Sequence, residues 1–258
     1  MIYLEKIFLP AEKRRIYPYR ILSSKMLNVI SFSPVTIFYG SNGSGKSTLL
    51  NVIAEKINIR HKTKGNNSLH FNEFVEDCEF ETATKNETNL KIPSRSRFIR
   101  SEDIMEGIAI LRRETDEALH KIKKAQSMTV DGKQYNFPSV IEGAWGAFNL
   151  LPDQCSNGEA AMSFFENIFE PETLYLLDEP DNSLSPALQL VLKEKIEKYA
   201  YLLDCQFIIA THSPFLLSVK NATVYNLDHC PSTVCKWQDL ENVRIFYDFF
   251  QKNKALFS

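Results

Sequence analysis

A glycine-rich loop constrains this chain more than any other stretch of its sequence. The segment Gly40–Thr48 reads Gly-Ser-Asn-Gly-Ser-Gly-Lys-Ser-Thr and matches the pattern G-x-x-x-x-G-K-[ST] in full. It follows the apolar run Val35–Tyr39 and precedes the apolar segment Leu49–Ala54. This order of strand, loop and helix is the context that a phosphate-binding loop requires. The sequence therefore predicts that the chain holds the phosphates of a nucleoside triphosphate.

Each residue type in the loop has a chemical reason to be there. The glycines allow a tight turn in which successive backbone N–H groups point at a polyphosphate, and the following helix adds the positive end of its dipole. We expect Lys46 to place its cation on the outer phosphates and Ser47 to offer its hydroxyl to Mg²⁺. The nucleotide-binding residues predicted in the loop are Ser41, Asn42, Gly43, Ser44, Gly45, Lys46, Ser47 and Thr48.

Length and composition fit one large domain of a soluble protein. The 258 residues are 44% hydrophobic and 24% charged, as in ordinary globular chains. A net charge of −2 argues against a strongly basic nucleic-acid-binding module, although a local basic patch stays open. No apolar stretch is long enough to cross a bilayer, and residues 1–10 do not resemble a signal peptide. The five cysteines are scattered and odd in number, which favours reduced thiols and a cytoplasmic protein without membrane insertion.

The order of predicted elements indicates an α/β fold with a mostly parallel sheet. Apolar or alternating runs predict strands at residues 2–9, 35–39, 70–75, 78–81, 172–177, 206–210, 223–227 and 233–237. Helical patterns predict helices at residues 46–59, 138–151 and 239–257, and another that starts at Ser101. A further helix is predicted to start after its capping residue Ser185 and to end at about Leu203. Between the helix from Ser101 and the segment 138–151, Val130–Lys133 predicts a tight turn.

Polar residues follow two of the predicted buried strands. Asp178 and Glu179 come directly after one strand, at the carboxyl end where an open α/β sheet binds its ligand. We expect Asp178 to hold Mg²⁺ together with Ser47, and Glu179 to orient and deprotonate the attacking water. His212 follows another strand within Ala-Thr-His-Ser-Pro and is predicted to contact the γ-phosphate. Glu179 and His212 are thus the predicted catalytic residues.

These motifs resemble the ATP-binding-cassette (ABC) type of ATPase, in the soluble branch related to SMC and RecF proteins. The chain looks similar to compact bacterial ATPases that carry a generic AAA or ATP-binding label. The resemblance spans most of the chain and implies a P-loop NTPase core that binds and hydrolyses ATP with Mg²⁺. In its terms Gly40–Thr48 is the Walker A loop, Leu174–Asp178 the Walker B strand, Pro180–Ser185 the D-loop, and His212 the switch histidine.

A signature motif also matches the family in place and in part of its sequence. Cys155-Ser156-Asn157-Gly158-Glu159 lies before the Walker B strand and opens a predicted helix. Ser156 and Gly158 keep the serine and glycine of the family's Leu-Ser-Gly-Gly-Gln. A serine hydroxyl and helix-opening N–H groups can form a second anion site. The resemblance implies that this site contacts the partner subunit's nucleotide, so that two chains meet head to tail around two ATP molecules.

The resemblance also implies a domain organisation. Residues 1–258 are expected to form a single ABC-type ATPase domain, with a core lobe at about 1–64 and 170–258. An inserted lobe at about 65–169 carries the signature and an arm of helices and strands. The interval between Thr48 and Cys155 is far too short for a long SMC-type coiled coil.

Two family elements have no direct match. No glutamine stands at the Q-loop position, where Ser101-Glu102-Asp103 is the expected substitute. The residue that stacks on the nucleotide base is expected near the N-terminus, and four candidates stay open. These candidates are Arg14, Arg15, Tyr17 and Tyr19.

Three functions are compatible with these features. The leading hypothesis is an ATPase whose hydrolysis resets an ATP-closed homodimer and drives or gates an effector protein or nucleic acid, for example in DNA repair or phage defence. The second is the nucleotide-binding subunit of an ABC transporter, which the absent Q-loop glutamine and the Ser-Asn-Gly-Glu signature disfavour. The third is a non-catalytic ATP-gated binding module, which the presence of Glu179 and His212 disfavours.

Overall fold

The computed structural model describes residues 1–12, 14–59, 68–110, 157–182 and 184–257, with the separate residues 113, 117, 129, 130, 133 and 134. The chain forms two compact units. The first contains Met1–Ser101, Phe169–Asn182 and Gln189–Ser258, and the second contains Glu102–Ile168 and Ser183–Leu188. Residues 68–101, which the sequence analysis assigned to an inserted lobe, belong to the first unit. The lobe boundaries proposed from the sequence stay a prediction.

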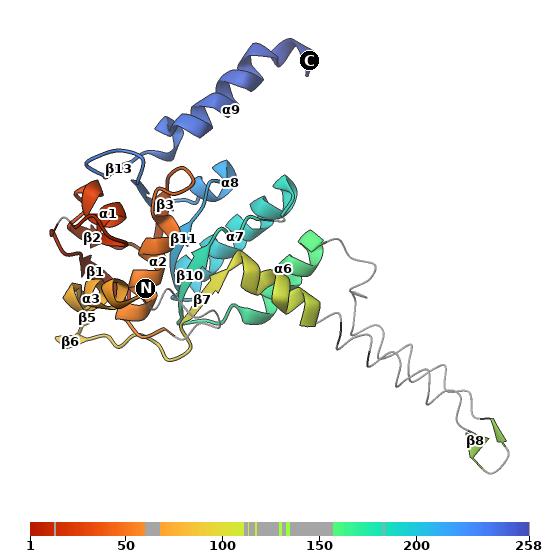
Figure 1. Cartoon of the computed structure of the whole chain (residues 1–258). Coiled ribbons are helices and arrows are strands. Elements are labelled where there is room, and N and C mark those ends of the chain that lie inside the picture. Colours follow the sequence, from red (N-terminus) through yellow and green to blue (C-terminus); the bar gives the residue numbers. More distant parts are fainter. Residues whose placement is uncertain are drawn as a thin grey trace. The chain divides into compact units, whose positions relative to one another are not determined.

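A six-stranded sheet lies at the centre of the described part of the first unit, in the order β13-β12-β3-β11-β10-β7 (Figure 1). Its strands are β3 (Val35–Tyr39), β7 (Arg97–Arg100), β10 (Leu174–Asp178), β11 (Gln206–Ala210), β12 (Thr223–Asn226) and β13 (Thr233–Cys235). All neighbours pair in parallel except β12 and β13, which pair antiparallel. The predicted α/β fold with a mostly parallel sheet is therefore confirmed.

The three central strands are buried along their whole length. Every residue of β3, β10 and β11 is buried, which explains why the sequence shows continuous apolar runs there instead of alternation. Helix α2 (Lys46–Lys56) packs against β10 and β11. The remaining helices of four or more residues with defined bounds are α1 (Tyr19–Leu22), α3 (Leu69–Asp77), α6 (Asn157–Ile168), α7 (Pro186–Leu202), α8 (Pro214–Leu217) and α9 (Glu241–Lys252).

A smaller antiparallel sheet, in the order β2-β1-β4, belongs to the same unit. It consists of β1 (Leu4–Phe8), β2 (Val29–Ser31) and β4 (Glu79–Thr82). The buried side chain of Gln206 joins it to the central sheet. Its Oε1 accepts hydrogen bonds from the N–H groups of Tyr3 and Leu4 at 2.8 and 2.9 Å, and its Nε2 donates to Leu4 O at 2.8 Å. Since Gln206 begins β11, these bonds anchor a central strand.

Short elements complete the description. Two two-stranded hairpins are formed by β5 (Thr84–Lys85) with β6 (Thr88–Asn89) and by β8 (Thr129–Val130) with β9 (Lys133–Gln134). The 3₁₀ turns are η1 (Ser23–Lys25), η2 (Trp237–Asp239) and η3 (Lys254–Leu256). Residues 101–110 are helical, as predicted, whereas the predicted helix at 138–151 lies outside the described residues. None of the described helices is long and apolar enough to cross a membrane.

The strand predicted at residues 70–75 is wrong, because this segment forms helix α3. Ser68 caps the helix, and its hydroxyl accepts a hydrogen bond from the N–H of Phe71 at 3.3 Å. Phe71 and Phe74 are both buried, and their spacing of three places them on one face of a helix. The six-residue window was too short to distinguish this spacing from strand alternation.

Within the second unit, the helical segment 101–110 packs closely against α6. A Cβ atom added to Gly107 would lie 2.5 Å from Cε2 of Phe164, so the glycine makes room for this ring. Ile104 and Ile108 are buried on the same side as Gly107, and Phe165 is buried on α6. The absence of a side chain at position 107 therefore sets how near the two helices approach.

Candidate nucleotide-binding site

The glycine-rich loop forms the turn between β3 and α2. Gly43 and Gly45 have φ angles of 80° and 105°, a left-handed conformation that glycine adopts without steric penalty. The N–H of Ser44 donates to Ser41 O at 3.0 Å and closes the turn. A Cβ atom at Gly45 would also lie 2.7 Å from Cγ2 of Ile21, so this glycine is required for two reasons. The loop geometry thus depends on the residues that define the motif.

The loop borders a cavity of about 270 Å³. Its lining residues are Ile21, Asn42, Gly43, Gly45, Lys46, Ser47, Thr48 and Glu179. Of the predicted loop residues, Ser41 and Ser44 do not line it. The Ser44 hydroxyl is buried and has no hydrogen-bond partner among the described residues. A buried hydroxyl without a partner, in a loop whose glycines adopt left-handed conformations, fits a phosphate-binding loop.

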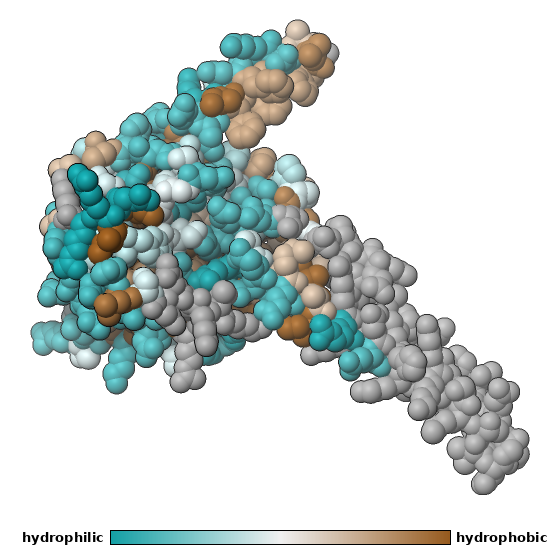
Figure 2. All heavy atoms as spheres, viewed as in Figure 1, coloured by the Kyte–Doolittle hydropathy of each residue, from teal (hydrophilic) through white to brown (hydrophobic). Residues whose placement is uncertain are grey.

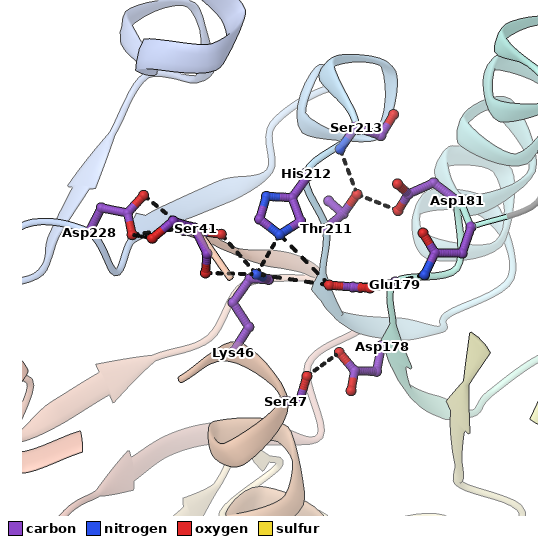
Figure 3. Close-up of polar contacts among 12 residues, drawn as sticks. Ser41, Lys46, Ser47, Asp178, Glu179, Asp181, Thr211, His212, Ser213 and Asp228 are labelled. Atoms are coloured by element: carbon purple, nitrogen blue, oxygen red, sulfur yellow. Dashed lines mark hydrogen bonds and ion pairs between the residues drawn. The ribbon is translucent and has the colours of Figure 1, made fainter. Parts of the chain in front are cut away.

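Lys46 places a buried cation at the start of α2 (Figure 3). Its Nζ lies 2.8 Å from Gly40 O, 3.3 Å from Ser41 O and 2.6 Å from Nε2 of His212. Burial lowers the pKa of Lys46, and the carboxylate of Glu179, 4.0 Å from Nζ, opposes this shift. The Lys46 side chain is only 4% exposed, and Glu179 is the nearest carboxylate among these contacts. The cation is therefore well placed to bind an anion.

Sheet order brings His212 to the loop. Strand β11 lies between β3 and β10, so the residues that follow it face both the loop after β3 and the acidic pair after β10. Burial, and then the neighbouring Lys46, lower the pKa of His212. A neutral imidazole accepts the hydrogen bond from Lys46 on Nε2, and the same nitrogen lies 3.7 Å from Oε1 of Glu179.

Ser47 and Asp178 meet as the sequence predicts. The Ser47 hydroxyl donates to Oδ1 of Asp178 at 3.0 Å, which joins α2 to the end of β10. A hydroxyl beside a carboxylate is a hard-oxygen donor pair of the kind that Mg²⁺ uses together with phosphate oxygens and water. Among the described residues there is no group of three or more His, Cys, Asp or Glu side chains that could hold a metal alone. These two residues therefore fit Mg²⁺ as a partial ligand set.

Glu179 has an unusual backbone conformation for a residue with a side chain. Its φ angle is 50°, and its N–H donates to Ala210 O at 2.9 Å. The amide of Asn182 donates to Oε2 at 2.9 Å, while Oε1 faces Lys46 and His212. A left-handed glutamate costs on the order of 1 kcal/mol or more, so the surrounding bonds must enforce it. The result is a carboxylate with one oxygen held and one directed at the loop.

Sequence reasoning missed a hydrogen-bonded network that holds His212 from both sides. The Thr211 hydroxyl donates to Oδ1 of Asp181 at 2.5 Å and accepts a bond from the N–H of Ser213 at 2.9 Å. The Ser213 hydroxyl in turn donates to Oε1 of Gln189 at 2.6 Å. Burial raises the pKa of Asp181, and the bond from Thr211 opposes that shift. The segment around His212 is therefore tied to the start of the D-loop.

Two further contacts connect distant residues to the site. Nδ2 of Asn242, in the first turn of α9, donates to His212 O at 2.9 Å. The carboxylate of Asp228 accepts bonds from the N–H of Ser41 at 2.8 Å and from its hydroxyl at 2.7 Å. Asp228 reaches the loop because β12 lies beside β3 and the N–H of Leu227 donates to Tyr39 O. No sequence motif indicates either contact.

The other predicted site residues are placed as follows. Ser156 lies outside the described residues, and Gly158 is a buried residue of α6 in the second unit. Ser101 directly follows β7, the neighbour of β10. Tyr19 is fully buried, and its hydroxyl donates to Oδ2 of Asp77 at 3.0 Å, so its ring is not accessible to a nucleotide base. Arg14 covers the Tyr19 ring at 4.7 Å from its centroid.

Comparison with protein families identifies the class to which this arrangement belongs. A family model described as "ABC transporter" matches residues 29–182, which is more than half of the chain. The chain therefore belongs to the ABC family and is an ABC-type P-loop ATPase, as the motifs predicted. A second family model, described as "AAA domain, putative AbiEii toxin, Type IV TA system", matches residues 149–218. No curated protein sequence matches the chain.

Solved structures to which the chain is similar include SMC heads and an ATP-binding cassette. The SMC head domain from Thermotoga maritima is 15% identical, with 91% of this chain and 99% of that chain covered and a TM-score of 0.45. An SMC head bound to the C-winged helix domain of ScpA is 17% identical, with 90% and 97% covered and a TM-score of 0.49. A dimeric post-hydrolysis state of the ATP-binding cassette MJ0796 with ADP and phosphate is 14% identical, with 93% and 100% covered and a TM-score of 0.43.

Proposed function

We propose that the chain binds ATP with Mg²⁺ and hydrolyses it to ADP and phosphate. The observation that carries this proposal is the convergence of side chains from separate segments on one loop. Lys46 Nζ lies 2.6 Å from His212 and 4.0 Å from Glu179, and Ser47 bonds Asp178 at 3.0 Å beside them. A cation, a hard-oxygen pair and a carboxylate at one phosphate loop are the groups that phosphoryl transfer to water needs.

Binding residues and the metal ligands have separate roles in this proposal. The backbone N–H groups of the loop from Gly43 to Thr48 hold the phosphates, and Lys46 neutralises charge on the outer ones. Ser47 and Asp178 would hold Mg²⁺, which supplies charge neutralisation at the phosphates when it is bound. Both ligand residues lie at the ends of regular elements, which keeps their geometry rigid.

Glu179 is the proposed general base and His212 the residue that contacts the γ-phosphate. Asn182 holds one carboxylate oxygen of Glu179, and the other oxygen, which faces Lys46 and His212, would accept a proton from the attacking water. His212 is neutral, because burial and Lys46 lower its pKa, and it therefore adds no cation that would compete with Lys46. The bonds around Thr211 keep this imidazole at the loop.

We further propose that two chains close head to tail around two ATP molecules. Ser156 and Gly158 would contribute the second anion site, acting on the nucleotide held by the partner copy. ATP would favour the closed state because only there does each γ-phosphate contact groups from both chains. We place this cycle in the cytoplasm, where it drives or gates an effector protein or nucleic acid, with DNA repair and phage defence as candidate settings. The toxin–antitoxin description of the second family model favours an effector partner.

The decisive experiment uses Glu179→Gln. We expect ATP turnover to fall by about 10²–10⁴-fold while ATP binding persists, because the substitution removes the base but no phosphate contact. We also expect an ATP-dependent dimer in sedimentation or light scattering. Glu172→Gln is the matched control, since Glu172 also has a left-handed φ of 53° but is an exposed residue outside the site. A Glu179→Gln protein whose association does not increase at saturating ATP would rule out the closed-dimer mechanism.

The signature segment can be tested separately. Ser156→Arg should prevent closure of the Glu179→Gln dimer, because a bulky side chain would fill the proposed anion site. Binding of ATP by the monomer should be unchanged, since Lys46 and the loop remain intact. ATP-dependent association that survives Ser156→Arg would place the ATP-dependent interface elsewhere.

A transporter subunit is the second candidate function. The description "ABC transporter" of the family model that matches residues 29–182 favours it. The test is co-purification of the intact chain with a membrane-embedded protein from its natural host. Stable, stoichiometric recovery with such a protein would replace the soluble effector in the proposal.

A further inference from the structure

Helix α9 exposes a large apolar surface (Figure 2). The exposed large apolar side chains of α9 and of the residues that follow it are Ile245, Phe246, Tyr247, Phe249, Phe250, Leu256 and Phe257. Their exposed fractions range from 49% for Phe246 to 81% for Leu256. Within α9, all of whose residues are described, Val243 alone is buried. An aromatic face of this size has no cover within the described part of the chain.

Within the described part of the chain, the contacts that anchor the helix to the first unit lie at its start. Leu240, which caps α9, is 1% exposed, and Val243 is 8% exposed. Asn242 adds the hydrogen bond to the main chain of His212. Beyond this first turn the helix extends away from the central sheet (Figure 1). The aromatic face is therefore presented on a rigid element and not on a loose tail.

The exposed area matches what a protein–protein interface buries. Aromatic side chains present about 150–250 Å² each, so the seven side chains expose on the order of 800 Å². The largest apolar patch of a typical monomer is only about 300–600 Å². Burying two thirds of this surface on each of two copies would remove roughly 1,100 Å², which exceeds the ~1,000 Å² expected of a specific interface.

The arrangement of residues favours a second copy over a lipid surface. Phe246, Phe249 and Phe250 have the i, i+3, i+4 spacing of a helix–helix seam. The charged residues of the opposite face alternate in sign along the helix as Glu241, Arg244, Asp248 and Lys252. This face has no net charge, so two copies can approach without repulsion. A helix that lies on an anionic membrane would need an excess of lysine and arginine.

We propose that α9 is a self-association surface, through which two copies of the chain pair by their Phe246, Phe249 and Phe250 faces. The contact is isologous, so each substitution in it acts twice. It needs no nucleotide and is distinct from the ATP-dependent closure proposed above. Through Asn242, each paired helix is bonded directly to the main chain of the histidine at the nucleotide site of its own copy.

The experiment is sedimentation equilibrium of the full chain without nucleotide. We expect the wild-type chain to dimerise in the micromolar range, and Phe249→Asp to weaken dimerisation by about 100-fold or more, since a charge enters the seam from both sides. Gln251→Asp is the matched control, because it adds the same charge on the polar face, three residues after Asp248. This control should dimerise like the wild type.

Circular dichroism and ATP affinity establish that the variants are folded, since neither should change in Phe249→Asp. A wild-type chain that is monomeric at about 100 µM would overturn the proposal, because a dimer with a dissociation constant in the micromolar range is mostly formed at that concentration. A dimer that is equally stable in Phe249→Asp would also overturn it. Binding of the wild-type monomer to vesicles of phosphatidylcholine and phosphatidylglycerol, lost in Phe249→Asp, would assign the face to lipid instead. Because nucleotide is absent, none of these results depends on ATP hydrolysis.

Discussion

The nucleotide-site edge of the central sheet and helix α9 belong to one unit, yet they are opposite kinds of surface. At the site, Lys46, Glu179 and His212 contact one another within 4.0 Å, and the Ser47–Asp178 bond lies beside them. Along α9, the aromatic side chains of the described residues are about half exposed or more. The first surface is organised from within the chain, whereas the second is incomplete without another molecule.

The two surfaces differ because polar and apolar side chains interact differently with water. Polar groups can satisfy one another before a ligand arrives, and a small anion then replaces some of these contacts. Apolar side chains gain nothing from a preformed arrangement in water, because their stabilisation requires that water be displaced. The bond from Nδ2 of Asn242 to His212 O connects the two surfaces. Variants that affect one surface and spare the other therefore test whether they are independent.

The largest effect is expected from Lys46→Ala. ATP affinity should fall at least about 100-fold, because the substitution removes the buried cation that faces the outer phosphates. Isothermal titration calorimetry measures this loss, and Lys56→Ala, at the other end of α2, is the control. Self-association through α9 should not change. Unaltered ATP affinity would mean that the loop is not the triphosphate site, and loss of both properties would mean that the two surfaces are not independent.

A smaller effect is expected from Thr211→Val, which removes the hydroxyl that joins Asp181 to Ser213. Turnover should fall about tenfold with ATP affinity unchanged, because His212 loses its alignment but the loop does not. Thr211→Ser keeps the hydroxyl and should restore turnover, which separates positioning from general destabilisation. Steady-state kinetics of the three proteins provides the measurement. If Thr211→Val and Thr211→Ser hydrolyse ATP at the same rate, the Thr211 hydroxyl does not position His212.

The smallest effect concerns the titration of His212. Burial and the neighbouring Lys46 lower the pKa of His212 below the ordinary value of 6.5. We expect an NMR titration to give a His212 pKa below 6.5. The unfolded chain then binds a proton before the folded chain does, so acidification through about 6.5 favours unfolding. Stability should therefore decrease as pH falls below 6.5, and His212→Gln should reduce this dependence. A His212 pKa above 6.5 would contradict the neutral imidazole in the proposed site.

Continuous local patterns were read correctly from the sequence. The run Val35–Tyr39 and the run Gln206–Ala210 are strands with the predicted bounds, because burial on both faces leaves only apolar residues. The prediction of a strand at residues 70–75 was wrong because Phe71 and Phe74 fit strand alternation only loosely and fit one face of a helix well. Short windows carry too few residues to separate the two periods.

Contacts between distant segments could not be read in this way. The sequence places Asp181 in the D-loop but does not indicate which residue it bonds, and nothing near Asp228 or Asn242 indicates a role at the loop. Their partners are Thr211, Ser41 and His212. The contacts of Asp181 and Asp228 depend on strand order, which places β10 beside β11 and β12 beside β3. Strand order is a property of the whole sheet and leaves no local trace.

The loop Gly40–Thr48, the acidic pair after a buried strand, and membership of the ABC-type ATPases could all be predicted from the sequence alone. These features are local, since a phosphate loop needs glycines, a lysine and a hydroxyl in a fixed short order. The contacts among Lys46, Glu179 and His212, and the bond by which Asn242 joins the site to an exposed aromatic helix, are visible only in the folded chain. Proximity across a parallel sheet arises from packing and pairing of remote strands, and the order of residues along the chain does not specify it directly.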